Sequence, residues 1–153
     1  IKERQSLASK IINAKKGNFP FDPYREEKLI KKLVTSGLDK FLVEKVWRQI
    51  ISANLSIQKV LKIGVAGNDD EIKSAYSAHF GNYFDTTYFI SVVSLLASLD
   101  KKDIEIGFLD SDSLIKIKKH SDIKVNFEII GNVPLYKTSN QSSYNIIKLK
   151  NSK

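Results

Sequence analysis

The sequence predicts an α plus α/β protein, with a three-helix all-α domain at residues 1–58 followed by a small α/β sheet domain at residues 59–153. Through the first part, apolar residues recur at the spacing of amphipathic helices. From Lys59 onward, short runs rich in β-branched and aromatic residues alternate with helical stretches, the order typical of an α/β sheet. A chain of 153 residues, 42% of them hydrophobic, can bury a substantial core in one large or two small domains.

Start and stop signals define the three helices. The first is expected to run to about Lys16 and to stop at Gly17. The second begins at Asp22-Pro23, an N-cap acceptor followed by proline, and ends near Ser36-Gly37. Asp39 can cap a third helix that reaches about Gln58. The predicted inward residues are Leu29, Ile30, Leu33 and Val34 in the second helix, and Leu42, Val43, Val46, Trp47, Ile50, Ile51 and Leu55 in the third.

The second part is expected to contain five strands and three helices. Glycines, prolines and polar clusters separate the periodic stretches. The predicted strands cover residues 60–67, 85–90, 104–109, 124–130 and 144–149, and the predicted helices cover 69–80, 92–99 and 113–119, with a turn-rich segment around residues 134–141.

Composition excludes several classes of function. The chain has no cysteine, so neither disulfides nor thiolate chemistry is available, which fits a cytoplasmic protein. No apolar run is long enough to cross a bilayer, so no membrane partner is expected. Its two histidines, His79 and His120, are far apart and beside no carboxylate cluster, so no metal or other cofactor is predicted. The net charge is +8, and residues 1–58 hold 12 Lys and Arg against 6 Asp and Glu, which favours an anionic partner.

Polar side chains stand where a plain helical protein would place apolar ones. Arg4 and Lys15 return to nearly the same face of the first helix, and that face is its apolar stripe. Because an unpaired charge is costly in an apolar interior, these cations require an anion as a partner, either from the protein or from a ligand. Simpler interpretations remain open for each residue, namely helix capping, a solvated charge run or a buried amide bonded to the backbone. The other polar groups directed at the shared interior are Asp22, Arg25 and Glu26 on the second helix and Asn54 and Gln58 on the third.

Three motifs match a known family. They are Glu3-Arg4 followed by Asn13-Ala14-Lys15-Lys16, the run from Phe21 to Glu27 (Phe-Asp-Pro-Tyr-Arg-Glu-Glu), and the run from Val46 to Gln58. In order and spacing, residues 1–58 resemble the all-helical chorismate mutases, intertwined homodimers that convert chorismate to prephenate on the route to phenylalanine and tyrosine. The resemblance covers a little over a third of the chain.

The resemblance implies a role for each site residue. Arg4 would clamp a substrate carboxylate, Lys15 and Gln58 would donate to the ether oxygen, and Glu26 would accept from the ring hydroxyl. Arg25 and Asp22 would shape the pocket, and Asn54 would lie near the ring carboxylate. The rearrangement is pericyclic, so it requires no nucleophile, general base or cofactor. In the family a further arginine from the first half of the first helix reaches the partner subunit, and we expect that stretch to precede Ile1.

Residues 60–150 weakly resemble a degenerate prephenate dehydratase domain, through the turn between Gly64 and Gly67 and the sequence Ala78-His79-Phe80-Gly81. No arginine follows Arg48, so no dehydratase activity is expected from this part. An alternative for the whole chain is a non-catalytic basic binding or regulatory module, for RNA or an aromatic amino acid. The basic residues are mostly lysine and the aromatic residues form no stacking platform, which argues against nucleic acid.

Overall fold

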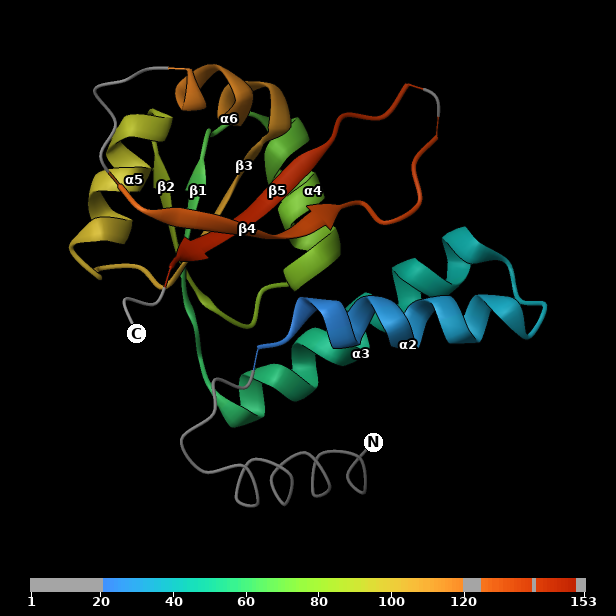
Figure 1. The fold of residues 1–153 in the computed structure, drawn as a ribbon. Coiled ribbons are helices and arrows are strands. Elements are labelled where there is room, and N and C mark those ends of the chain that lie inside the picture. The colour runs from blue at the N-terminus through green and yellow to red at the C-terminus, as the bar shows by residue number, and fades with distance from the viewer. Residues whose placement is uncertain (1–20, 120–124, 139, 151–153) are drawn as a thin grey trace.

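The structure is a computed structural model that describes residues 21–119, 125–138 and 140–150. The first predicted helix, with Arg4 and Lys15, lies outside the described residues. Two further helices follow, α2 at Pro23–Thr35 and α3 at Lys40–Gln58, as predicted. Asp22 caps α2 through the backbone nitrogen of Arg25 at 3.2 Å, and Asp39 caps α3 in the same way. Figure 1 shows the two helices lying side by side, and α3 runs on toward the first strand.

The remaining elements form an α/β unit, as the sequence predicts. Its five strands make one mixed sheet in the order β2-β1-β3-β5-β4. Strands β1, β2 and β3 are parallel, and β5 runs antiparallel to both β3 and β4. The strands are β1 (Lys62–Ala66), β2 (Asp85–Phe89), β3 (Ile106–Asp110), β4 (Phe127–Val133) and β5 (Tyr144–Leu149), and the helices are α4 (Asp70–Phe80), α5 (Val92–Asp100) and α6 (Ser111–Lys118).

Strand β4 is the element whose position differs most from the prediction. It ends at Val133, three residues beyond the predicted end at Ile130. Gly131-Asn132 is typical of a strand end, but pairing with β5 continues past a bulge at Ile129/Gly131 as far as Val133 opposite Tyr144. Cross-strand hydrogen bonds therefore extend the strand up to Pro134, which has no N–H to donate.

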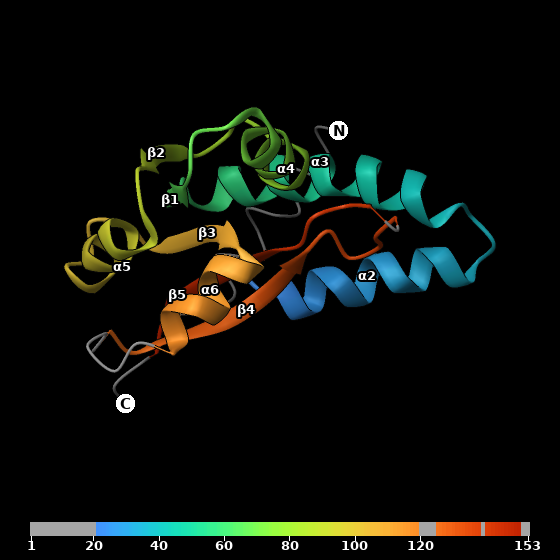
Figure 2. The same cartoon turned by 90° about the horizontal axis from the view of Figure 1, so that it is seen from above.

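The sheet separates two hydrophobic cores, and helices cover both of its faces (Figures 1 and 2). Successive residues of a strand point to opposite faces, so Phe108 and Ile146 enter one core, while Leu109 and Ile147 enter the other. The first core packs under α4 and includes Leu55 of α3, which joins the helical part to the sheet. The second core lies under α5 and α6.

The buried face of α3 differs from the predicted one. Leu42 and Val46 were expected to point inward, but they are 59% and 46% exposed. The predicted inward residue Leu29 of α2 is also 40% exposed. Trp47, Ile50 and Ile51 are half-buried, while Val43 and Leu55 are buried as predicted. In place of Leu42 and Val46, α3 buries polar residues.

Gly107 allows the sheet and α5 to approach closely. A Cβ at this position would lie 2.8 Å from both Cγ1 of Ile147 and Cδ2 of Leu95, and both neighbours are fully buried. We expect Gly107→Ala to lower the free energy of unfolding by about 1–3 kcal/mol, because a packed core resists overpacking. Urea unfolding followed by circular dichroism measures the loss. An unchanged midpoint would show that the second core can expand freely at this point.

Candidate functional site

A polar stripe on α3 faces the α/β unit. Glu44, Arg48 and Ser52 are spaced four residues apart, so they lie on one side of the helix. All three are buried, with exposed fractions of 9%, 3% and 3%. Buried polar groups are normally hydrogen-bonded, so the partners of this stripe explain why α3 turns it inward.

Two residues of α3 bond the C-terminal end of α4. Ser52 donates to the carbonyl of His79 at 2.8 Å. Gln49 donates to the carbonyls of Ser77 and Ala78 at 3.1 and 3.0 Å. The last carbonyls of a helix have no partner within the helix, so these side chains satisfy groups that would otherwise lack hydrogen bonds. The guanidinium of Arg48 adds a positive charge close to this helix end, where a cation is favoured.

Arg48 also forms a buried ion pair with Glu26 of α2. Nη1 of Arg48 donates to Oε1 of Glu26 at 2.6 Å, and the two side chains are 4% and 13% exposed. Burial raises the pKa of Glu26 to about 7, although the charge and hydrogen bond of Arg48 act in the opposite direction. The Glu26 carboxyl therefore titrates near neutral pH.

His79 lines the same pocket as Arg48 and is also buried. Burial lowers the pKa of His79 well below its ordinary value, and the nearby charge of Arg48 lowers it further. The imidazole is therefore neutral at physiological pH and can both donate and accept a hydrogen bond.

Glu44 holds the chain that leaves β4. Its Oε2 accepts from the backbone nitrogen of Leu135 at 2.6 Å, and its Oε1 accepts from that of Tyr136 at 2.9 Å. Charge-assisted bonds of this kind are stronger than neutral ones. The carboxylate thereby fixes the segment after Val133 against α3.

We expect Glu44→Ala to release this segment. Leaving two buried backbone N–H groups unpaired should cost about 1–3 kcal/mol of folding free energy, and the segment should exchange its amide hydrogens faster. Hydrogen exchange read by mass spectrometry measures both the extent and the location of the change. Lys45→Ala, at the exposed neighbouring position, is the control. Equal protection of residues 135–138 in the two variants would contradict the role given to Glu44.

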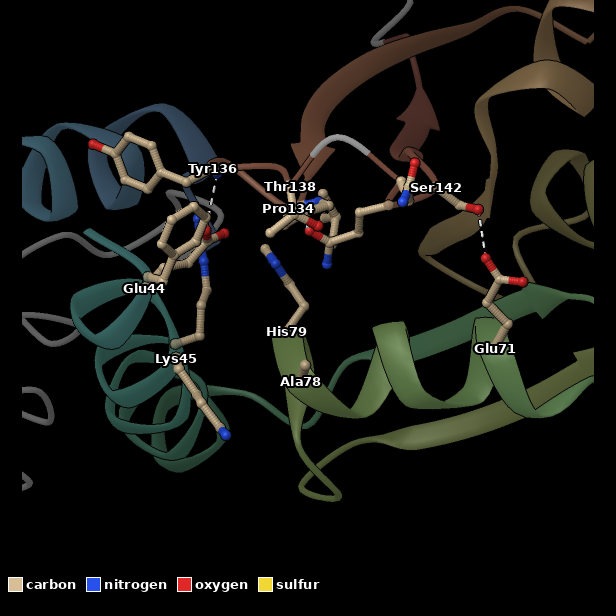
Figure 3. A pocket seen from close by; sticks show the side chains of 14 residues that line it. Glu44, Lys45, Glu71, Ala78, His79, Pro134, Tyr136, Thr138 and Ser142 are labelled. Carbon is tan, nitrogen blue, oxygen red and sulfur yellow. Dashed lines mark hydrogen bonds between the residues drawn. The ribbon is translucent and has the colours of Figure 1, made fainter. Parts of the chain in front are cut away.

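Glu44, Arg48 and His79 line a pocket between the helical part and the α/β unit, with a volume of about 680 Å³. Figure 3 shows Glu44 on α3 beside Tyr136, His79 pointing from α4 toward Pro134, and the amine of Lys45 pointing away from these side chains. A smaller pocket of about 410 Å³ lies at the start of α2 and is lined by Asp22, Tyr24, Glu128 and Lys148 among others. In the described ranges, no group of three His, Cys, Asp or Glu side chains could hold a metal ion.

The sequence-predicted site residues are distributed along the two helices. Asp22 is the exposed N-cap of α2, Arg25 is exposed, and Glu26 is paired with Arg48. The prediction that Arg25 faces a shared interior is therefore not met among the described residues. Asn54 and Gln58 are half-buried in the last turns of α3, and within the described part of the chain no hydrogen bond engages their side chains. Arg4 and Lys15 lie outside the described residues.

Sequence reasoning missed Arg48, Glu44 and His79 as members of a site. A signal was present, because Glu44, Arg48 and Ser52 repeat at four-residue spacing. The apolar stripe of the same helix is the stronger signal, and it predicts the opposite buried face. The sequence around His79 does not indicate a site, since its neighbours in the pocket come from other parts of the chain.

Comparison with known proteins gives a match for the helical part. Residues 1–59 match the family model of chorismate mutase type II. No curated protein and no solved structure matches the chain. The family match ends where the α/β unit begins, so the dehydratase-like interpretation of residues 60–150 remains a prediction. In the part of the chain that the structure describes, no helix is long and apolar enough to cross a membrane.

Proposed function

We propose that the chain is a chorismate mutase, converting chorismate to prephenate with residues 1–58. The observation that carries the proposal is the family match over residues 1–59, the segment that contains all seven predicted site residues. The product belongs to aromatic amino acid biosynthesis, and we expect this reaction to take place in the cytoplasm without a cofactor.

The proposed mechanism depends on positioning and charge. The rearrangement needs the compact conformer of chorismate and stabilisation of the negative charge that grows on the ether oxygen. Lys15 and Gln58 would donate to that oxygen, and Arg4 would hold a carboxylate with its planar guanidinium. Asn54 would lie near the ring carboxylate.

The start of α2 would supply the remaining contacts. Glu26 would accept from the ring hydroxyl of the substrate. The geometry supports this role, because the ion pair with Arg48 engages Oε1 and orients the carboxylate, leaving Oε2 to accept. Arg25 is exposed and thus accessible to a ligand, and Asp22 fixes its backbone by capping the helix.

We also propose that the helical part forms a homodimer. Leu38, Leu42 and Val46 are 54%, 59% and 46% exposed, an unusual state for large apolar side chains gathered at one end of a helix pair. Exposed apolar patches of this kind commonly mark protein interfaces. The α/β residues 59–153 would then form a second domain with a structural or regulatory role.

The direct test follows the loss of chorismate absorbance on adding the complete gene product. We expect first-order disappearance of chorismate at a rate proportional to protein concentration, with prephenate as the product. No acceleration over buffer would overturn the proposal. Analytical ultracentrifugation of the same preparation tests the dimer, and a monomer at micromolar concentration would contradict it.

A further inference from the structure

The pocket between α3, α4 and the segment after β4 has the features of a ligand site. Its volume of about 680 Å³ falls in the range of small-molecule sites. It lies where the helical part meets the α/β unit, and such junctions are preferred places for ligand binding. None of the five predicted mutase residues that the structure describes lines it.

The walls of the pocket are largely apolar and include two aromatic rings. Phe41 contributes a ring from α3, and Tyr136 contributes a second from the segment after β4. Val133, Pro134 and Ala78 complete this apolar lining. A ligand that fills this space buries apolar surface, which a ring of carbon atoms supplies.

Arg48 provides the polar anchor of the pocket. It is 3% exposed, and its Nε has no hydrogen-bond partner among the described residues. Burying an N–H group without an acceptor is unfavourable, so a ligand oxygen at this position would recover a hydrogen bond. A guanidinium matches a carboxylate better than any other common anion of this size, because its planar donors pair with two oxygens.

The other charged groups of the pocket do not compete for this role. The carboxylate of Glu44 is engaged by two backbone N–H groups, and that of Glu71 accepts from Ser142. His79 is neutral for the reasons given above, and Lys45 is exposed. Arg48 is paired with Glu26 through Nη1, so the group that it offers to an anionic ligand is its buried Nε–H.

We propose that this pocket binds a small carboxylate that carries one apolar ring. The ring packs against Phe41, Tyr136 and Pro134, and the carboxylate accepts from Arg48. This binding is separate from the proposed mutase reaction, because it uses none of the residues assigned to that reaction.

The test uses phenylacetate as the probe in isothermal titration calorimetry, with the full chain. We expect saturable binding to one site per chain, and at least tenfold weaker binding of the neutral isostere phenylacetamide. No heat of binding at millimolar phenylacetate, or equal affinity for the two compounds, would overturn the proposal.

A matched pair of variants locates the site without disturbing the ion pair of Arg48. Ala78 is exposed on α4 and lines the pocket, whereas Ala97 is exposed on α5 in the other layer. Ala78→Trp should fill the pocket and weaken phenylacetate binding by about tenfold or more, while Ala97→Trp should leave it unchanged. Binding that survives Ala78→Trp would place the probe elsewhere, for example at the mutase residues, and would overturn the assignment of this pocket.

Discussion

Replacement of Arg48 by methionine is expected to lower the free energy of unfolding by about 3–5 kcal/mol at pH 8. The change removes the partner of Glu26 and leaves a buried carboxylate without compensation. Denaturant unfolding of both proteins at the same pH measures the difference. Arg25→Met is the control, since Arg25 is exposed and its replacement should cost less than about 0.5 kcal/mol.

The loss of unfolding free energy caused by Arg48→Met should also depend on pH. The pKa of Glu26 is about 7 in the folded protein against an ordinary value of 4.5, so between these values the folded state holds a proton that the unfolded state has released. The contribution of Glu26 to stability therefore falls as the pH rises from about 4.5 to about 7, by about 3 kcal/mol in all. Below this window the carboxyl is protonated in both states.

Loss of Arg48 should therefore cost less at pH 5 than at pH 8, since the carboxyl left behind is then neutral. Glu26→Gln should remove most of the pH dependence, and the double variant should be more stable than the sum of the two single losses implies. Equal losses at pH 5 and pH 8 would show that the two side chains are not coupled in solution.

Lys15→Ala is expected to lower the catalytic rate constant by about 10²–10³ while substrate binding changes little. Under the proposed mechanism, Lys15 acts on negative charge that appears only as the ether bond breaks, so its loss affects the transition state more than the ground state. Steady-state kinetics on the complete gene product separates the two effects.

The neighbouring Lys16→Ala provides the matched control, since it removes the same charge one position along the chain. If Lys15 serves instead as a cation at a helix C-terminus, its loss should cost about 0.3–1 kcal/mol of stability and leave the rate constant intact. A Lys15→Ala protein that melts lower but turns over chorismate normally would remove Lys15 from the site.

The sequence by itself determined the secondary structure and its order. Asp22-Pro23 and Asp39 fixed the starts of two helices through local capping, and Gly81 ended α4 because its φ of +68° suits glycine. These signals act within a few residues, so they can be read without knowing the fold. The motifs of residues 1–58 likewise pointed to the family that the comparison matched.

The tertiary structure alone decided which face of α3 is buried. Periodicity favoured the stripe with Leu42 and Val46, but the polar stripe with Glu44 and Arg48 points inward. The polar stripe turns inward because groups from distant segments need hydrogen-bond partners. These groups are the last carbonyls of α4, the backbone N–H groups of Leu135 and Tyr136, and the Glu26 carboxylate. The four-residue spacing of Glu44, Arg48 and Ser52 marks one face of the helix, but their partners lie in distant segments and meet them only after folding. The pocket that these residues line could therefore be found only in the folded chain.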